Sequence, residues 1–163
     1  MTVDEILDAV IAREGGAIIT EDPTDRGGRT RYGISERAHP EAWLHGPPTL
    51  TDAKAIYARQ YVAPFADLVD IGIDERIRVA LIDDAVLSGV RAAIQTLQLA
   101  VGVEPDGVLG PKTIAAAHGE DGQYVLVRLV QRRAHRLARI VEHDTTQARY
   151  LVGWIDRCLS MLG

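Results

Sequence analysis

Residues 13–33 read Arg-Glu-Gly-Gly-Ala-Ile-Ile-Thr-Glu-Asp-Pro-Thr-Asp-Arg-Gly-Gly-Arg-Thr-Arg-Tyr-Gly. Two glycine pairs and a proline prevent a continuous helix through this stretch. One acid, Glu14, stands directly before the first glycine pair. A carboxylate that is followed by small residues and a turn-rich segment is typical of an acid lining a cleft, because glycines leave room for a ligand to approach. We therefore expect the candidate site here, where the first helix ends.

The residues before this stretch predict an amphipathic helix over 2–14, because apolar side chains recur at intervals of three and four. Glu14 lies four residues after Val10 and three after Ile11, so we expect it to continue the stripe that faces the core. A carboxylate in apolar surroundings favours its protonated form, which is the form of a general acid. The alternative interpretation is a surface glutamate at a frayed helix end.

The segment that follows Glu14 predicts a small β-hairpin, with residues 17–20 as one strand and 29–32 as the other. Asp22 and Asp25 lie between these strands. Each aspartate is either a turn residue that binds its own backbone or a second carboxylate that faces Glu14, as glycoside hydrolysis usually needs. Thr30 offers a hydroxyl for a water molecule or a sugar, although a plain strand threonine fits the pattern equally well.

The remainder of the chain is predicted to be mainly helical, because its apolar residues follow helical spacing between glycine and proline breaks. The expected helices cover residues 35–38, 52–61, 74–87, 90–101, 112–118, 121–143 and 146–162. The fold class expected from this pattern is mainly α with one small hairpin beside the site.

Four arginines recur along one face of the helix predicted over 121–143. They are Arg128, Arg132, Arg136 and Arg139. Such a stripe is most often a solvated face, and the alternative is a positive patch for an anionic cell-wall polymer. In the last predicted helix, Cys158 reads as a small apolar residue on the inward side.

Composition excludes several classes of protein. The 163 residues fit one domain, or one domain with a small appended part, and the net charge of −5 argues against a dedicated nucleic-acid binder. A single cysteine forms no internal disulfide and suits synthesis in a reducing compartment. No apolar run is long enough for a spanning helix, and the acidic first residues are not those of a secretory signal. The histidines lack metal-ligand spacing, so no metal or cofactor is expected.

At family level, the pattern of residues 14–35 resembles that of the phage-type N-acetylmuramidases of glycoside hydrolase family 108. The resembling residues are Glu14-Gly15-Gly16, Asp22-Pro23, Asp25, Gly27-Gly28, Thr30 and Gly33-Ile34-Ser35. Residues 83–89 resemble the central helix of that family, residues 97–113 its peptidoglycan-binding segment, and residues 153–157 its closing motif. Ala17 and Leu87 depart from the pattern, since an aromatic residue and an asparagine usually stand there.

The resemblance implies a lysozyme-like helical fold, with a catalytic part at 1–89 and a helical peptidoglycan-binding part at 90–163. It implies hydrolysis of the β-1,4 bond between N-acetylmuramic acid and N-acetylglucosamine, with Glu14 as the general acid. Asp22, Asp25 and Thr30 are the other expected catalytic residues. The expected substrate contacts are Gly15, Gly16, Arg29, Tyr32 and Asp84.

The resemblance also implies a biological setting. The expected partner is the glycan strand of peptidoglycan, and the expected protein is a monomer that does not insert into membranes. It would be made in a host cytoplasm and reach the cell wall in the periplasm through a holin-type or other export partner, as a phage lysin or as a secretion muramidase. Two alternatives remain, a lytic transglycosylase and a non-catalytic peptidoglycan-binding protein.

Overall fold

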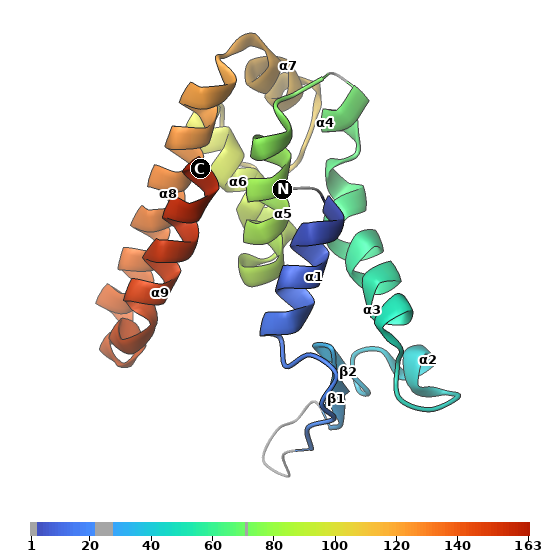
Figure 1. Ribbon diagram of the computed structural model, residues 1–163. Coiled ribbons are helices and arrows are strands. Elements are labelled where there is room, and N and C mark those ends of the chain that lie inside the picture. Colours follow the sequence, from blue (N-terminus) through green and yellow to red (C-terminus); the bar gives the residue numbers. More distant parts are fainter. Residues whose placement is uncertain (1–2, 22–27, 71) are drawn as a thin grey trace. The chain divides into compact units, whose positions relative to one another are not determined.

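The computed structural model describes residues 3–21, 28–70 and 72–163. The chain divides into two compact units, Met1–Ala63 and Pro64–Gly163, and each is described by itself. Helices dominate both, and the described residues contain a two-stranded sheet in the first unit (Figure 1). The mainly helical fold class predicted from the sequence is therefore confirmed. No helix in the described ranges has the length and apolar character needed to cross a membrane.

The first unit consists of short helices and one hairpin. In chain order its elements are α1 (Val3–Arg13), β1 (Thr30–Arg31), β2 (Ile34–Ser35), α2 (Pro40–Trp43), α3 (Leu50–Tyr57) and the π-helical turn η1 (Ala58–Val62). Helices α1 and α3 pack against each other. The hairpin follows the C-terminal end of α1 (Figure 1).

Helix α1 buries its apolar stripe, as its spacing predicts. The buried side chains are Ile6, Leu7, Val10 and Ile11. Helix α3 begins with a capping box, in which the Asp52 N–H donates to the Thr49 hydroxyl and the Thr49 N–H donates to the Asp52 carboxylate. Its buried residues are Ala53, Ile56 and Tyr57, whereas Ala55 is exposed.

The hairpin differs from the predicted one. Strand β1 pairs with β2, with Thr30 opposite Ser35, and Thr20 contributes only an isolated bridge to Thr30. Tyr32 and Gly33 both adopt positive φ, at 53° and 76°, which suits the tight turns that join antiparallel strands. The helix predicted over residues 35–38 is wrong, because Ser35 belongs to β2 and the next helix, α2, begins at Pro40.

All the regular elements described in the second unit are helices. Its elements are η2 (Ala63–Phe65, which starts at the last residue of the first unit), α4 (Asp67–Asp70), α5 (Glu75–Ser88), α6 (Val90–Val101), α7 (Pro111–Gly119), α8 (Gly122–His143), η3 (Thr145–Gln147), α9 (Ala148–Leu159) and η4 (Ser160–Leu162). The bounds of α5 to α8 agree with the predicted ones to within one or two residues.

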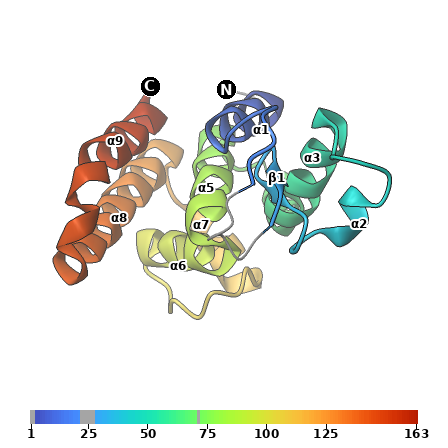
Figure 2. The same cartoon turned by 90° about the horizontal axis from the view of Figure 1, so that it is seen from below.

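Helices α8 and α9 lie side by side in both views (Figures 1 and 2). An apolar cluster joins them, and it consists of Val130, Leu137 and Cys158 with Leu151 and Trp154 packed against it. Burial raises the pKa of the Cys158 thiol, so the thiol stays protonated and behaves as an apolar group. This agrees with the interpretation of Cys158 from the sequence.

A buried cluster of charges crosses the second unit. Asp83 on α5 accepts from the Arg157 Nε through both carboxylate oxygens, at 3.0 Å each. Arg133 on α8 lies 2.7 Å from Asp83 Oδ2 and is only 4% exposed. Three helices are thereby held to one carboxylate, and the ion pairs offset the cost of removing these charges from water.

The neighbouring carboxylate, Asp84, is also buried, with 3% of its surface exposed. It pairs with Arg133 and Arg136 and accepts from the Ser88 hydroxyl. Arg136 also donates to the Thr96 hydroxyl at 2.7 Å. The interpretation of the four arginines as one outward-facing stripe is therefore wrong at Arg136, because its guanidinium turns inward to Asp84.

We predict that Arg133→Met lowers the free energy of unfolding by about 3–5 kcal/mol, because it leaves two buried carboxylates with fewer partners. Urea denaturation followed by circular dichroism measures the effect. The matched control is Arg139→Met on the same helix, where the arginine is exposed, and it should change stability by less than about 0.5 kcal/mol. Equal unfolding midpoints for the two variants would show that the ion cluster does not stabilise the fold.

Candidate active site

Glu14 follows α1 directly, and its N–H donates to the Val10 carbonyl at 3.0 Å. The backbone then turns away, because Gly15 and Gly16 have φ of 98° and 56° and the Gly16 N–H closes the helix by donating to the Ile11 carbonyl at 3.1 Å. The Glu14 side chain is exposed, although Val10 and Ile11 are buried. The prediction that Glu14 faces the core is therefore wrong, because the helix ends before that position and leaves its carboxylate at the surface.

Gly33 lies against Glu14. A Cβ atom added at Gly33 would meet the Tyr57 hydroxyl at 2.3 Å and the Glu14 Cβ at 2.9 Å. The hairpin turn, the end of α1 and the last residue of α3 therefore converge on one point. Only glycine fits there, both for lack of space and because φ is positive.

Tyr57 supplies a neutral hydroxyl to this point. Its side chain is buried, with 5% exposed, and burial raises its pKa, with the Glu14 charge and then Tyr61 adding to the effect. The hydroxyl thus remains protonated at all physiological pH values and can donate a hydrogen bond. The rings of Tyr57 and Tyr61 pack with their centroids 5.6 Å apart. Nothing in a linear pattern links residue 57 to residue 14, so this contact could not be predicted from the sequence.

The hairpin is fastened to the glycine pair. The Tyr32 N–H donates to the Gly16 carbonyl at 2.9 Å, and Arg31 Nε donates to the Ala17 carbonyl at 3.0 Å. The Arg31 guanidinium also lies over the Tyr32 ring, 5.0 Å from its centroid. These contacts bring Tyr32 to the segment that follows Glu14.

Thr30 closes the base of the segment that carries Asp22 and Asp25. It exchanges two backbone hydrogen bonds of 2.9 Å with Thr20, and its side chain is half-buried. Asp22 and Asp25 themselves lie outside the described residues.

The two charged residues expected to contact substrate have partners within the protein. Arg29 is exposed and forms a two-pronged ion pair with Glu36, at 2.9 and 2.7 Å, beside the Trp43 ring. The Glu36 hydrogen bonds raise the pKa of Arg29, and the same contact lowers the pKa of Glu36. Asp84 lies within the second unit in the buried charge cluster, and this burial corrects the expectation that it contacts substrate.

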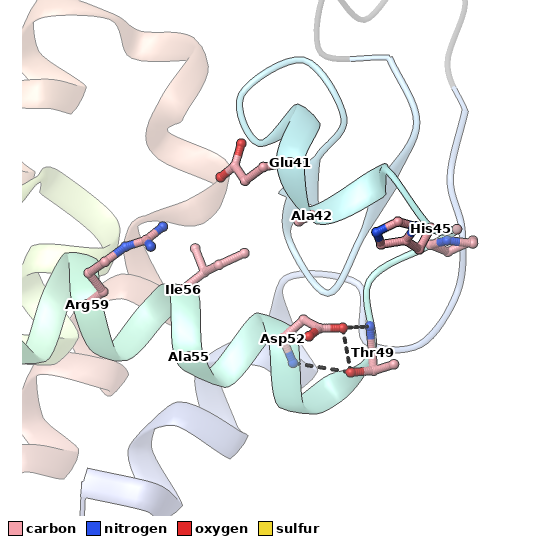
Figure 3. Close-up of a pocket in the computed structure, with 10 residues that line it drawn as sticks. Glu41, Ala42, His45, Thr49, Asp52, Ala55, Ile56 and Arg59 are labelled. Carbon is pink, nitrogen blue, oxygen red and sulfur yellow. Dashed lines mark hydrogen bonds between the residues drawn. The ribbon is translucent and has the colours of Figure 1, made fainter.

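A pocket of about 400 Å³ opens elsewhere on the first unit (Figure 3). Its lining residues come from α2, the loop after it, α3 and η1, and they include Glu41, His45, Asp52, Ile56 and Arg59. Glu14 does not line it. The described residues contain no group of three histidine, cysteine, aspartate or glutamate side chains that could hold a metal ion.

Comparison with known families assigns the class of protein. Residues 7–89, about half of the chain, match the family described as Glycosyl hydrolase 108, and residues 92–159 match a family described as Predicted Peptidoglycan domain. The chain belongs to glycosyl hydrolase family 108. It is a glycoside hydrolase that acts on peptidoglycan and carries a peptidoglycan-binding domain, which confirms the family resemblance seen in the sequence.

One solved structure extends the comparison to the whole chain. It is described as that of SagA from Brucella abortus, and it shares 29% sequence identity with this chain and a TM-score of 0.72. The match covers 98% of this chain and 90% of the other. The lysozyme-like, mainly helical fold is thereby supported along nearly the full length. A search of curated proteins gave no match.

We predict that Gly33→Ala lowers both stability and activity, because the new methyl group would overlap the Tyr57 hydroxyl and the Glu14 Cβ. Overpacking of this kind costs about 1–3 kcal/mol. The matched control is Gly28→Ala, where φ is also positive, at 71°, but no atom lies within 4 Å of the added Cβ. Urea denaturation and clearing of purified cell walls should both show the larger loss for Gly33→Ala. A loss that is equal in the two variants would mean that backbone strain alone is responsible.

Proposed function

We propose that the chain is an N-acetylmuramidase, a lysozyme that hydrolyses the β-1,4 bond between N-acetylmuramic acid and N-acetylglucosamine. The observation that carries this proposal is the setting of Glu14. Its exposed carboxylate stands at the end of a rigid helix, beside Gly33 and the buried, neutral Tyr57. Tyr57 provides a donor that can orient Glu14, and the exposed side of the carboxylate is open to a glycan.

In the proposed reaction, Glu14 protonates the oxygen of the leaving sugar. A bound glycan would exclude water from the carboxyl group and so favour its protonated form before the transfer. Asp22 or Asp25 would stabilise the positive charge that develops on the other sugar, or orient the attacking water. Thr30 would help to hold that water, and Gly15, Gly16, Tyr32 and Arg29 would line the path of the glycan.

The two parts of the chain take different roles in this proposal. Residues 1–89 carry the catalytic groups, and residues 90–163 bind peptidoglycan and so keep the enzyme on its polymeric substrate. The glycan strand is the proposed partner, and the proposed active species is a monomer.

We propose a phage lysin as the biological setting, on the basis of the family pattern in residues 14–35. Release from the cytoplasm would then need a membrane hole, so expression with a holin should lyse host cells and expression alone should not. Lysis without a holin would contradict this export route. A bacterial cell-wall role is the second candidate, because the similar solved structure comes from Brucella abortus.

We predict that Glu14→Gln lowers the rate of cell-wall hydrolysis by at least about 100-fold, because the amide keeps the shape of the side chain and cannot donate the proton. Release of reducing sugar from purified peptidoglycan measures the rate. The control is Glu142→Gln, an exposed glutamate on α8, which should retain the wild-type rate. A wild-type rate in Glu14→Gln would rule out Glu14 as the acid.

Two rival activities give different results in the same assay. A lytic transglycosylase would leave anhydro-muramyl ends, which mass spectrometry of the products detects. A non-catalytic binding protein would sediment with cell walls and release no reducing sugar. Either outcome would contradict the muramidase proposal.

We predict that one of Asp22→Asn and Asp25→Asn lowers kcat strongly and that the other has little effect, because a single second carboxylate is sufficient for the reaction. Steady-state kinetics of both variants on the same peptidoglycan would identify that aspartate. If both variants keep the wild-type kcat, neither aspartate has the proposed role.

A further inference from the structure

The pocket of about 400 Å³ on the first unit has the size of a small-ligand site, since such sites range from about 300 to 1,000 Å³. One wall is α2 with Glu41 and the loop after it. The opposite wall is α3 and the π-helical turn η1, which contributes Arg59. None of the site residues considered above lines it, so its function is separate from that of Glu14.

The two walls carry opposite charges. Figure 3 shows the ends of the Glu41 and Arg59 side chains on the same side of the pocket, with Ile56 beside them. The pKa of Glu41 is lowered, first by its own backbone N–H, then by His39, and further by the charge of Arg59. Among the described residues, however, no hydrogen bond or ion pair joins Glu41 to Arg59. Their charges interact across a space that a ligand can fill.

The other polar groups of the pocket leave this pair as its main charged feature. Both Asp52 and Thr49 are used in the capping box of α3, in which Thr49 donates to Asp52 at 2.8 Å through its N–H and at 2.6 Å through its hydroxyl. The apolar residues that line the pocket include Ala42, Pro47 and Ile56.

This arrangement fits a ligand that has both a carboxylate and an ammonium group on a short aliphatic frame. Arg59 matches a carboxylate because its guanidinium can donate two parallel hydrogen bonds. Glu41 matches an ammonium group, and Ile56 matches the carbon frame between them. N-acetylglucosamine has neither charge and N-acetylmuramic acid has at most a carboxylate, whereas the peptide part of peptidoglycan has amino-acid ends with both.

The position of the pocket relative to Glu14 suits such a ligand. Ile56 lines the pocket, and the next residue, Tyr57, reaches the Glu14 site. Successive residues of a helix project about 100° apart, so Ile56 and Tyr57 face different sides of α3, which is only about 10–12 Å wide with its side chains. An extended tripeptide spans about 10 Å, so a peptide attached to a sugar near Glu14 can reach the pocket.

We infer that this pocket binds the amino-acid end of a peptidoglycan stem peptide, with Arg59 on its carboxylate and Glu41 on its ammonium group. The inference rests on the proposed function, because it names the part of that same substrate that the enzyme recognises beside the glycan. It makes the enzyme selective for strands that still carry free stem peptides.

Direct binding tests the pocket without any catalysis. The probe is the tripeptide L-alanyl-γ-D-glutamyl-meso-diaminopimelate, titrated into the full chain and followed by NMR. Arg59→Gln and Glu41→Gln should each weaken binding at least tenfold, and acetylating the free amines of the probe should weaken it similarly. Arg37→Gln is the charge-matched control, since Arg37 is exposed and does not line the pocket. No binding by the wild type at millimolar peptide, or equal binding by all variants, would overturn the inference.

Cleavage of two substrates separates this inference from the catalytic proposal. The ratio of kcat/KM for peptide-bearing strands to that for peptide-free strands should fall at least fivefold in Arg59→Gln. An equal loss on both substrates would instead make the pocket part of the glycan site and overturn the peptide assignment. Wild-type cleavage by Glu14→Gln would overturn the catalytic proposal, while the tripeptide titration would still decide the inference about the pocket.

Discussion

At Gly33 a hydrogen atom occupies the place where any other residue has a Cβ, and the Tyr57 hydroxyl and the Glu14 Cβ both lie within 3 Å of that place. Three parts of the first unit meet there, namely the end of α1, the hairpin turn and the end of α3. Through its contact with Gly33, Glu14 is held beside the Tyr57 hydroxyl. The same close approach holds Tyr57 in a buried setting that keeps its hydroxyl neutral.

The second unit depends on charge as much as on apolar packing. Asp83 and Asp84 are adjacent on α5, and each pairs with arginines from other helices. Buried ions do not destabilise a fold only when all of them are paired in good geometry. The cluster therefore constrains the rotation of α5 about its own axis. The family match over residues 7–89 also includes α5, although this helix packs against α6 and α8 of the second unit. The family boundary and the structural boundary therefore differ.

Local signals in the sequence were sufficient to predict the bounds of most helices. Gly89 and Gly102 bound α6, Pro111 opens α7, and Asp121 caps α8. Each of these residues acts on the backbone of its own or a neighbouring turn. Contacts between distant segments could not be predicted this way. The inward turn of Arg136 depends on Asp84, 52 residues away. The hairpin register depends on positive φ at Tyr32, a residue type that rarely adopts it.

The candidate site likewise has features that local sequence predicts and features that depend on contacts between distant segments. Glu14 was found from its place before the glycine pair and from the family pattern, but its exposure was not, because helical phase alone does not show where the core ends. Tyr57 gave no sign of its contact with Gly33, since residues 33 and 57 are joined only by the fold. The Glu41 and Arg59 pocket was missed for a further reason: it is formed by separate elements, and no single motif contains its residues.

The bridge between Thr20 and Thr30 affects how the length of the segment between them can vary in evolution. Two backbone hydrogen bonds of 2.9 Å tie the ends of the intervening segment, so the hairpin on one side and the glycine pair on the other are anchored independently of what lies between. Lengthening a tied loop is inexpensive, at about 0.6 kcal/mol for each doubling. Changes in the length of this segment would therefore move the proposed catalytic aspartates, Asp22 and Asp25, while the surroundings of Glu14 are preserved.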